Sequence, residues 1–347
     1  MAPFASLAAN RIAHGVVMYL LMCLAYSIVF NGVADNALRA RVDEEVGMAL
    51  KSAGNLSPAD YDRLRDGLRA AKIREFRLDE PLASRVLLRA LDVASFRFGR
   101  SQTVTSASGD RQVLSIVLEA LPNTLALFGT EAILVMLLGG AVGVLAARRQ
   151  GGLLDRVASV LPMVFNGLPT WWVGMLALML LAYVIPLFPS GGVHANPTPA
   201  GLAGAVDYLY HMALPLLTLV SLNLWNPAWL VRNLVGDTWE RDFVRFARAK
   251  GLSERRVAFH VVAAIRPAAA TMALLGLLQS LAGNILVEGI FGWPGLGGLY
   301  FAAVQQYDVP VLMGVLSLQT AINLAGLVAL DLAYDWLDPR IRLGGSA

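Results

Sequence analysis

Ionisable side chains are few in the long apolar stretches of this 347-residue chain, and Glu131 is the one acid deep inside such a stretch. A lone carboxyl in an apolar helix can be a structural hydrogen-bonding group, a proton-coupling acid, or a pore-lining group that contacts a solute. The polar side chains that are candidates to line a pore are Glu131, Asn223, Asn226, Gln279 and Asn284.

The motifs of known catalytic sites are missing from the sequence. The three lysines, Lys51, Lys72 and Lys250, do not follow a glycine, so there is no Walker-type phosphate loop. Neither Gly-x-Ser-x-Gly nor His-Glu-x-x-His occurs. The single cysteine, Cys23, and four scattered histidines offer no metal-ligand spacing. We therefore expect no enzyme activity, cofactor or metal in this chain, and energy for uphill transport would come from a partner or an ion gradient.

A basic segment with a central glycine, residues 245–267, lies between two apolar stretches and carries six Lys/Arg against one acid. The stretch from Thr238 to Lys250 can form a helix, and Gly251 suits the left-handed position just past a helix end. Ser253 can then cap a second helix. The pattern predicts a helix–glycine–helix hairpin.

Two roles fit this hairpin. Its arginines could hold the loop at lipid headgroups and set the topology. Alternatively, Ala247, Ala249 and Gly251 could leave a low-relief turn that a partner protein approaches closely. The residues that would form such a docking loop are Phe243, Arg245, Ala247, Arg248, Ala249, Lys250, Gly251, Leu252 and Ser253.

The composition places these residues in a membrane protein. Hydrophobic residues make up 56% of the chain and charged residues 15%, against about a quarter charged in soluble domains. The mean hydropathy is +0.58. A bilayer span needs roughly 20 apolar residues, and six stretches qualify: 12–34, 124–147, 157–188, 208–231, 267–287 and 309–330. The third contains Pro162, Pro169 and Pro186, which predict a broken or tilted span.

Lys and Arg near the span ends predict the orientation. Basic residues follow spans two, four and six, and the 189–207 loop has none. The rule therefore predicts a multi-pass protein of the cell (inner) membrane with both termini in the cytoplasm. An even number of spans agrees with this orientation. The first apolar stretch is longer than the core of a signal peptide, so we expect an uncleaved span.

The stretch after the first span differs in composition, with fourteen Lys/Arg and twelve Asp/Glu in residues 35–112. Such a long segment translocates largely regardless of its charge. Ser57-Pro58-Ala59-Asp60 is a helix start, and "LASRVLLRAL" predicts a second helix. We expect a small helical extracytoplasmic insert that either caps the protein or helps to receive substrate.

A turn rich in glycine, "EGIFGWPGLGG", follows the fifth span. Its glycines and proline predict a tight re-entrant or interfacial turn, with Trp293 anchored at the headgroup level. Glu288, Trp293, Pro294 and Gly295 would form a structural turn or, alternatively, an outer gate that contacts a partner.

Several motifs together resemble one family. "DFVRFARAKGLSERRV" at 242–257 is similar to the cytoplasmic signature loop of binding-protein-dependent ABC importer permeases, and most similar to B-type subunits of the dipeptide, oligopeptide and nickel permeases. The accompanying motifs in family order are Phe98-Gly99-Arg100-Ser101, "LPNTL" at 121–125, "LPTWWVG" at 168–174, "LFPSGG" at 187–192, "VEGIFGWPGLGGL" at 287–299, "YDVP" at 307–310 and "LDPRIRL" at 337–343. Glu131 departs from the family, which carries apolar residues there.

The resemblance implies an all-α integral membrane protein with six transmembrane helices of the type I ABC importer permease fold. Its parts would be the first span (1–34), the extracytoplasmic helical insert (35–112), a permease core (113–343) with five spans and the cytoplasmic coupling loop 236–266, and a C-terminal tail (344–347).

The same resemblance implies the partners. A second permease subunit (normally a different chain) would complete the pore, two ATP-binding subunits would carry ATP and Mg, and an extracytoplasmic binding protein would deliver a peptide or similar small solute. No nucleic acid is implied. The alternatives from other classes are an ion-coupled secondary transporter and a membrane assembly subunit that transports nothing.

Overall fold

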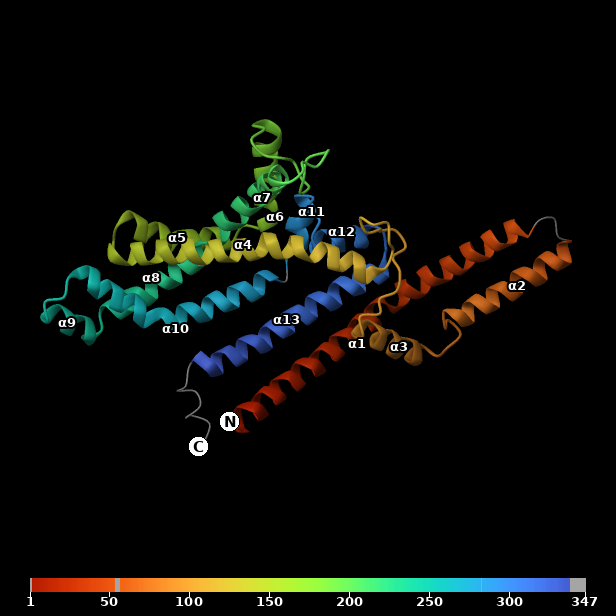
Figure 1. The fold of residues 1–347 in the computed structure, drawn as a ribbon, viewed down its shortest axis with the longest axis horizontal. Coiled ribbons are helices and arrows are strands. Elements are labelled where there is room, and N and C mark those ends of the chain that lie inside the picture. The colour runs from red at the N-terminus through yellow and green to blue at the C-terminus, as the bar shows by residue number, and fades with distance from the viewer. Residues whose placement is uncertain (1, 54–56, 282, 338–347) are drawn as a thin grey trace. The chain divides into compact units, whose positions relative to one another are not determined.

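The computed structural model describes residues 2–53, 57–281 and 283–337, with residues 2–7, 279, 281 and 333–337 described by their backbone alone. Across these residues the regular secondary structure is helical (Figure 1), joined by one isolated β-bridge between Arg100 and Gln112. The expected tail at 344–347 and most of the "LDPRIRL" motif lie outside the described residues.

The chain forms two compact units. The first comprises Met1–Glu119 and Ala302–Ala321, and the second comprises Ala120–Phe301 and Ile322–Ala347. The first unit holds α1 (Ala2–Ser52), α2 (Pro58–Glu75) and α3 (Leu82–Ala94). The helices α4 (Val113–Arg148), α12 (Leu296–Gln305) and α13 (Val309–Leu337) each run from one unit into the other.

Five helical segments in the described chain are long and apolar enough to cross a membrane: Ala8–Ser52, Val113–Arg148, Leu202–Trp239, Glu254–Leu278 and Val309–Leu332. A bent pair, Leu153–Asn166 with Thr170–Val184, makes a sixth if it counts as one span. The all-helical, membrane-spanning fold predicted from composition is thereby confirmed.

The first span extends beyond its predicted end. α1 continues without a break from Ala2 to Ser52, so no change of structure marks residue 34. Residues 37–41 are alanine, leucine and arginine, which favour helix strongly. The first part of the predicted insert is therefore a continuation of the first helix.

The third span is broken, as its prolines predict. α5 (Leu153–Asn166) and α6 (Thr170–Leu178), which continues as the π-helix η1 (Met179–Val184), meet at an angle of 96°. The break falls at Gly167-Leu168-Pro169, where a proline disfavours helical backbone in the residue before it. Pro162 is accommodated inside α5.

Two glycines bring α4 into backbone contact with the fourth span, which consists of α7 (Leu202–Asn223) and α8 (Trp225–Trp239). A Cβ added at Gly139 would lie 2.7 Å from the carbonyl oxygen of Leu224, and one at Gly143 would lie 2.5 Å from that of Ala228. Small residues four apart allow such approach between membrane helices.

The remaining helices of the second unit are α9 (Asp242–Ala249), α10 (Glu254–Leu281) and α11 (Ile285–Ile290). The predicted fifth span, 267–287, is displaced: α10 begins thirteen residues earlier than predicted, at Glu254, and ends at Leu281. The polar Asn284 then starts the separate short helix α11, because its side chain accepts a hydrogen bond from the Val287 amide.

The predicted insert contains both expected helices. Ser57 caps α2, with its side chain accepting a hydrogen bond from the Asp60 amide at 3.3 Å. An apolar cluster of Val42, Val46, Leu50 and Leu78 joins the end of α1 to the segment after α2. Hydrogen bonds to Glu45 and Glu75 raise the pKa of Lys72 on α2. The helices of this region are therefore held by both apolar and ionic contacts.

Asp308, fully buried at the start of α13, ties down the loop that precedes α4. Its Oδ2 accepts hydrogen bonds from the Ser101 hydroxyl (2.6 Å), the Gln102 amide (2.9 Å), and the amide and hydroxyl of Thr103 (3.0 and 2.9 Å). Four donors on one carboxylate oxygen make this the densest hydrogen-bonded point of the first unit's described residues.

Asp308→Ala should destabilise the protein by about 1–3 kcal/mol, because it leaves buried donors without their acceptor. Asp92→Ala is the matched control, since Asp92 pairs with Arg97 at 3.1 Å on the surface and exposed pairs contribute at most about 1 kcal/mol. Thermal unfolding of the solubilised protein measures both, and an Asp308→Ala effect no larger than that of Asp92→Ala would contradict this role.

Candidate functional site

The second unit contains a cavity of about 610 Å³ lined by α4, α6, α7, α8 and α10. Four of the five polar residues predicted to line a pore, Glu131, Asn223, Asn226 and Asn284, do line this cavity. The side chain of Gln279 lies outside the described residues. Thr170 and Ser280 add two hydroxyl groups that sequence reasoning did not single out, because one hydroxyl in an apolar stretch carries little signal.

Glu131 is buried, with 6% of its surface exposed. The side-chain amide of Asn223 donates a hydrogen bond of 2.9 Å to its Oε1. The two residues are 92 positions apart in the chain, and they meet because α4 and the α7–α8 span approach through Gly139 and Gly143. The sequence predicted each residue as a candidate but not their pairing.

Two of the predicted pore residues also have structural partners. Asn226 exchanges two amide hydrogen bonds with Asn166 (2.8 and 3.1 Å), which joins α8 to the end of α5. Asn284 accepts the Val287 amide at 3.1 Å and so caps α11. These contacts fix the polar wall of the cavity, in which Glu131 is the one ionisable side chain of the described lining.

The basic hairpin (residues 242–257) has the predicted glycine turn but a shorter first helix. α8 ends at Trp239, and α9 begins only at Asp242, so the expected continuous helix from Thr238 is wrong. Gly251 has φ +77°. Its amide donates to the Arg248 carbonyl, and the Leu252 amide donates to the Ala247 carbonyl, which is a Schellman helix end.

The hairpin is anchored by residues that sequence reasoning missed. Val244 on α9 and Val257 and Val261 on α10 are fully buried in one apolar cluster with residues of α4 and α8. Ala247 and Leu252 pack against the same cluster. Ala247 therefore supports the turn from beneath and keeps only part of its surface exposed.

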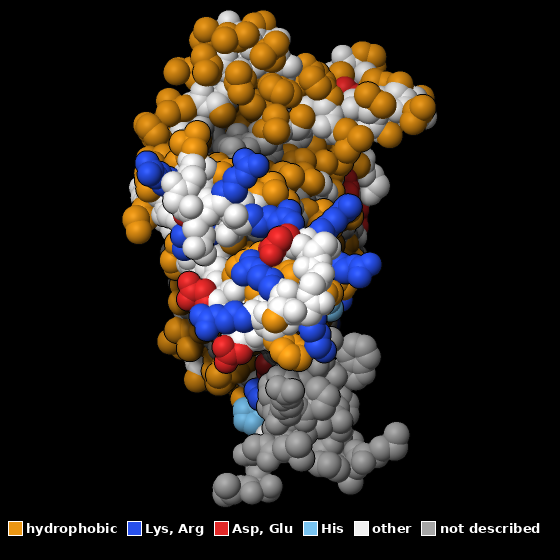
Figure 2. Space-filling view, turned by 90° about the vertical axis from the view of Figure 1, so that its left-hand side faces the viewer, with side chains coloured by type: hydrophobic (Ala, Val, Ile, Leu, Met, Phe, Trp, Pro, Cys, Tyr) orange, Lys and Arg blue, Asp and Glu red, His pale blue; other side chains and the backbone are white. Residues whose placement is uncertain are grey.

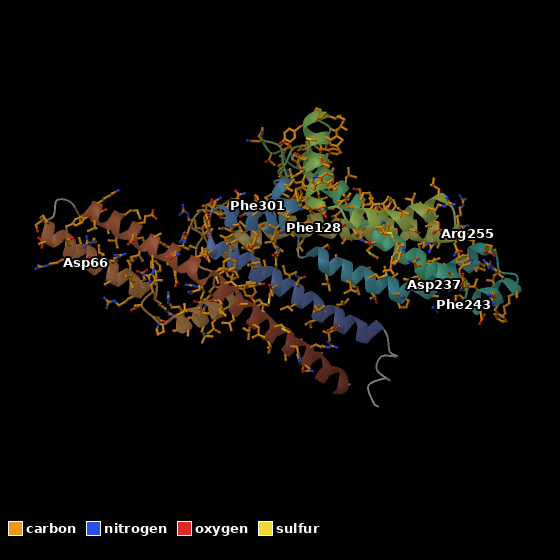
Figure 3. The ribbon with its side chains drawn as sticks, turned by 180° about the vertical axis from the view of Figure 1, so that it is seen from behind. Asp66, Phe128, Asp237, Phe243, Arg255 and Phe301 are labelled. Carbon is orange, nitrogen blue, oxygen red and sulfur yellow. The ribbon has the colours of Figure 1, made fainter. Side chains whose placement is uncertain are left out.

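The outer surface of the hairpin combines aromatic and basic side chains. Phe243 and Phe246 are 39% and 63% exposed, and Phe259, just beyond the hairpin on α10, is 60% exposed. The Lys250 ammonium lies 4.5 Å from the centre of the Phe246 ring. Phe243 and Arg255 lie together at this end of the second unit (Figure 3). Large exposed aromatic groups with adjacent cations are typical of a protein interface.

Lys and Arg side chains gather on this end of the second unit (Figure 2). Arg248 pairs with Glu254 across the turn at 2.8 Å, and that carboxylate raises the pKa of the Arg248 guanidinium. The remaining basic side chains of the hairpin, Arg245, Lys250, Arg255 and Arg256, are exposed. The face is therefore basic around its aromatic centre.

The glycine-rich turn (residues 284–298) packs around one buried carboxylate. Glu288 is fully buried, and its carboxylate accepts hydrogen bonds from the Thr124 hydroxyl (3.0 Å) and the Gly298 amide (3.0 Å). Thr124 also accepts the Leu296 amide at 2.7 Å. The motif "LPNTL" and the glycine-rich turn, which sequence reasoning noted separately, are thus one structural element.

Trp293 is buried inside the protein, so it is not the exposed headgroup anchor that the sequence predicted. Its ring is 1% exposed, packs edge-on against Tyr208, and donates a hydrogen bond of 2.9 Å to the Asn123 carbonyl. Asn123 in turn donates to the Pro294 carbonyl at 3.0 Å. Because the indole NH has a hydrogen-bond acceptor inside the protein, the ring can be buried without leaving a donor unpaired.

Comparisons with known proteins identify the family of the chain. The family described as "Binding-protein-dependent transport system inner membrane component" matches residues 139–343. The oligopeptide transport system permease protein AppB of Bacillus subtilis is 30% identical over 234 residues, which cover 66% of this chain and 72% of that protein.

Two dipeptide permeases are also similar. The dipeptide transport system permease protein DppB of B. subtilis is 30% identical over 271 residues (77% of this chain, 82% of the relative). The protein of the same name from Escherichia coli K12 is 35% identical over 226 residues (59% and 66%).

Gly295→Ala should lower the free energy of unfolding by about 1–3 kcal/mol, the usual cost of overpacking, because the glycine-rich turn has no room for a methyl group. The added Cβ would lie 2.3 Å from the Glu288 carboxylate and 2.4 Å from the Thr124 hydroxyl. Gly140→Ala, in α4 with open space around its Cβ position, is the control and should not destabilise. Thermal unfolding in detergent compares the two variants. Equal melting temperatures would contradict the close packing of the glycine-rich turn at Gly295.

Proposed function

Since the chain belongs to the family of binding-protein-dependent transport system inner membrane components, we propose that it forms half of the pore of an ATP-driven importer for peptides or a similar small solute. Chains of this family are membrane subunits without catalytic activity of their own. ATP and Mg would be held by two partner ATPase subunits, and a binding protein would deliver the solute. A second permease subunit would complete the pore.

The observation that carries this proposal is the basic hairpin, an exposed helix–glycine–helix unit built on a rigid base. The cluster around Val244, Val257 and Val261 connects it to α4 and α8, both of which line the cavity. A force applied to the exposed face would therefore reach the cavity wall through packed side chains. The residues proposed to contact the ATPase are Phe243, Arg245, Phe246, Arg248, Ala249, Lys250, Gly251 and Ser253.

An ion pair supports the same mechanical path. Arg232 on α8 binds Asp155 on α5 through two hydrogen bonds of 2.6 and 3.2 Å, and the Gly151 amide donates to the same carboxylate at 2.8 Å. The Asn166–Asn226 pair joins the other end of α5 to α8. Two attachments make α5 and α8 move together, so rotation of α8 would reshape the cavity.

Orientation is part of the proposal. The basic end that Figure 2 views carries the hairpin, and the positive-inside rule places that end in the cytoplasm, where ATPase subunits are found. Both termini would then be cytoplasmic. The helices α2 and α3 would lie outside, where a binding protein could reach them.

Gly251→Arg should abolish the stimulation of ATP hydrolysis by loaded binding protein and reduce uptake of a labelled dipeptide about tenfold or more, because a bulky side chain would project from the docking turn. The assay uses the complete complex in proteoliposomes. Basal ATP hydrolysis and subunit stoichiometry are measured in parallel.

Gly109→Arg is a closely matched control. Gly109 has φ +78° and open space at its Cβ position, as Gly251 has, but it lies in the loop before α4. The two variants therefore share the backbone strain and the added charge. Equal loss of coupling in both would overturn the docking assignment, and ion-driven uptake by the chain without ATPases would overturn the importer itself.

A further inference from the structure

We propose that Glu131 and Asn223 form an anionic subsite in the cavity that binds the protonated amino group of the transported solute. The inference rests on the proposed function, because it takes the cavity as part of the solute's path. It adds the chemistry of recognition: a primary ammonium group, held transiently by a carboxylate.

Within the described residues, one carboxylate oxygen of Glu131 has no side-chain hydrogen-bond donor and is open to a ligand. Asn223 donates to Oε1 at 2.9 Å, and among the side chains that the structure describes none donates to Oε2. Asn223 accordingly fixes the orientation of the carboxylate without neutralising it. An ammonium group brings three donors and a full positive charge, which suits the free oxygen.

The charge of the cavity points the same way. Glu131 is the one ionisable residue of the cavity's described lining, and that lining includes no Lys, Arg or His. A buried carboxylate without a cation is costly to ionise. A cationic ligand removes that cost while it is bound, so the site favours cations over neutral and anionic solutes.

A further hydrogen-bond acceptor lies in the same space. Ser280 lines the cavity with Glu131, and its hydroxyl, which donates to the Leu277 carbonyl at 2.9 Å, can still accept an N–H. The volume of about 610 Å³ falls within the range of small-molecule sites, about 300–1,000 Å³. There is room for a small solute together with water.

Glu288 shows what a purely structural carboxyl looks like in this protein. Its two oxygens are occupied by Thr124 and Gly298, and Gly295 packs so closely that a methyl group would not fit. Glu131 differs on both points, since it has a free oxygen and faces a cavity. The two buried glutamates of the second unit therefore have different roles.

The test uses a cysteine reporter at Ser280, placed in a Cys23→Ser background in the complete complex with its ATPase subunits. The probes are a cationic thiol reagent, trimethylammonium-ethyl methanethiosulfonate, and its anionic counterpart, sulfonatoethyl methanethiosulfonate. With Glu131 present, the cationic reagent should react about tenfold faster relative to the anionic one, after correction for their intrinsic rates, as expected for one nearby charge.

Glu131→Gln should reduce that preference to about one, and Glu131→Asp should keep most of it. Glu119→Gln is the control, because it removes a negative charge from the same helix outside the cavity lining. Millimolar n-butylammonium should slow labelling when Glu131 is present, whereas neutral n-butanol should not. A second reporter at Thr170 repeats the measurement from α6.

A charge preference that survives Glu131→Gln would overturn the subsite, and so would equal protection by butylammonium and butanol. Uptake driven by a pH gradient and lost in Glu131→Gln would replace it with a proton-carrying role. Labelling is measured without ATP, so the two proposals fail separately: loss of stimulated ATP hydrolysis with an intact charge preference rejects only the importer function. Loss of the preference with normal stimulation rejects only the subsite.

Discussion

Close contact between α4 and the α7–α8 span, made possible by Gly139 and Gly143, is the constraint on which the second unit depends. In lipid, apolar surface gives helices little reason to associate, so backbone approach and internal polar pairs decide the packing. With the two backbones this close, Glu131 and Asn223 are directly hydrogen-bonded in the wall of the cavity. Larger residues at 139 and 143 would separate the helices and remove both the pairing and the base of the hairpin.

Polar side chains in the apolar helices fall into two groups by the completeness of their hydrogen bonding. The first group has its hydrogen bonds satisfied within the protein and holds helices at fixed positions: the Asn166–Asn226 pair, the Asp155–Arg232 pair, and Glu288 with Thr124. Among the described residues, one carboxylate oxygen of Glu131 has no side-chain donor and Glu131 lines the cavity, whereas the basic hairpin exposes aromatic and basic side chains at the surface. The functional proposals rest on these groups, because a buried group whose hydrogen bonds are satisfied within the protein has nothing left to bind a ligand with.

Much of this fold could be predicted from local sequence signals, and the failures share a physical cause. Proline at 169, glycine at 251 and the Ser57 cap act over a few residues, so their consequences were predicted correctly. The packing of Ala247 and the burial of Trp293 depend on partners distant in the chain. Trp293 alone resembles a headgroup anchor, and its burial depends on Asn123, Tyr208 and an apolar cluster that includes Leu127 and Met212.

The central claim is that the exposed face of the basic hairpin binds an ATPase subunit, and site-specific photocrosslinking tests it most directly. Benzoylphenylalanine placed at Phe246, which is 63% exposed, with Tyr61 of α2, which is 44% exposed, as an aromatic control, would be irradiated in membranes containing the assembled complex. The account predicts an adduct with the ATPase subunit from position 246 and none from position 61. Adducts from 246 with lipid alone in an assembled complex, or an ATPase adduct from position 61, would contradict it.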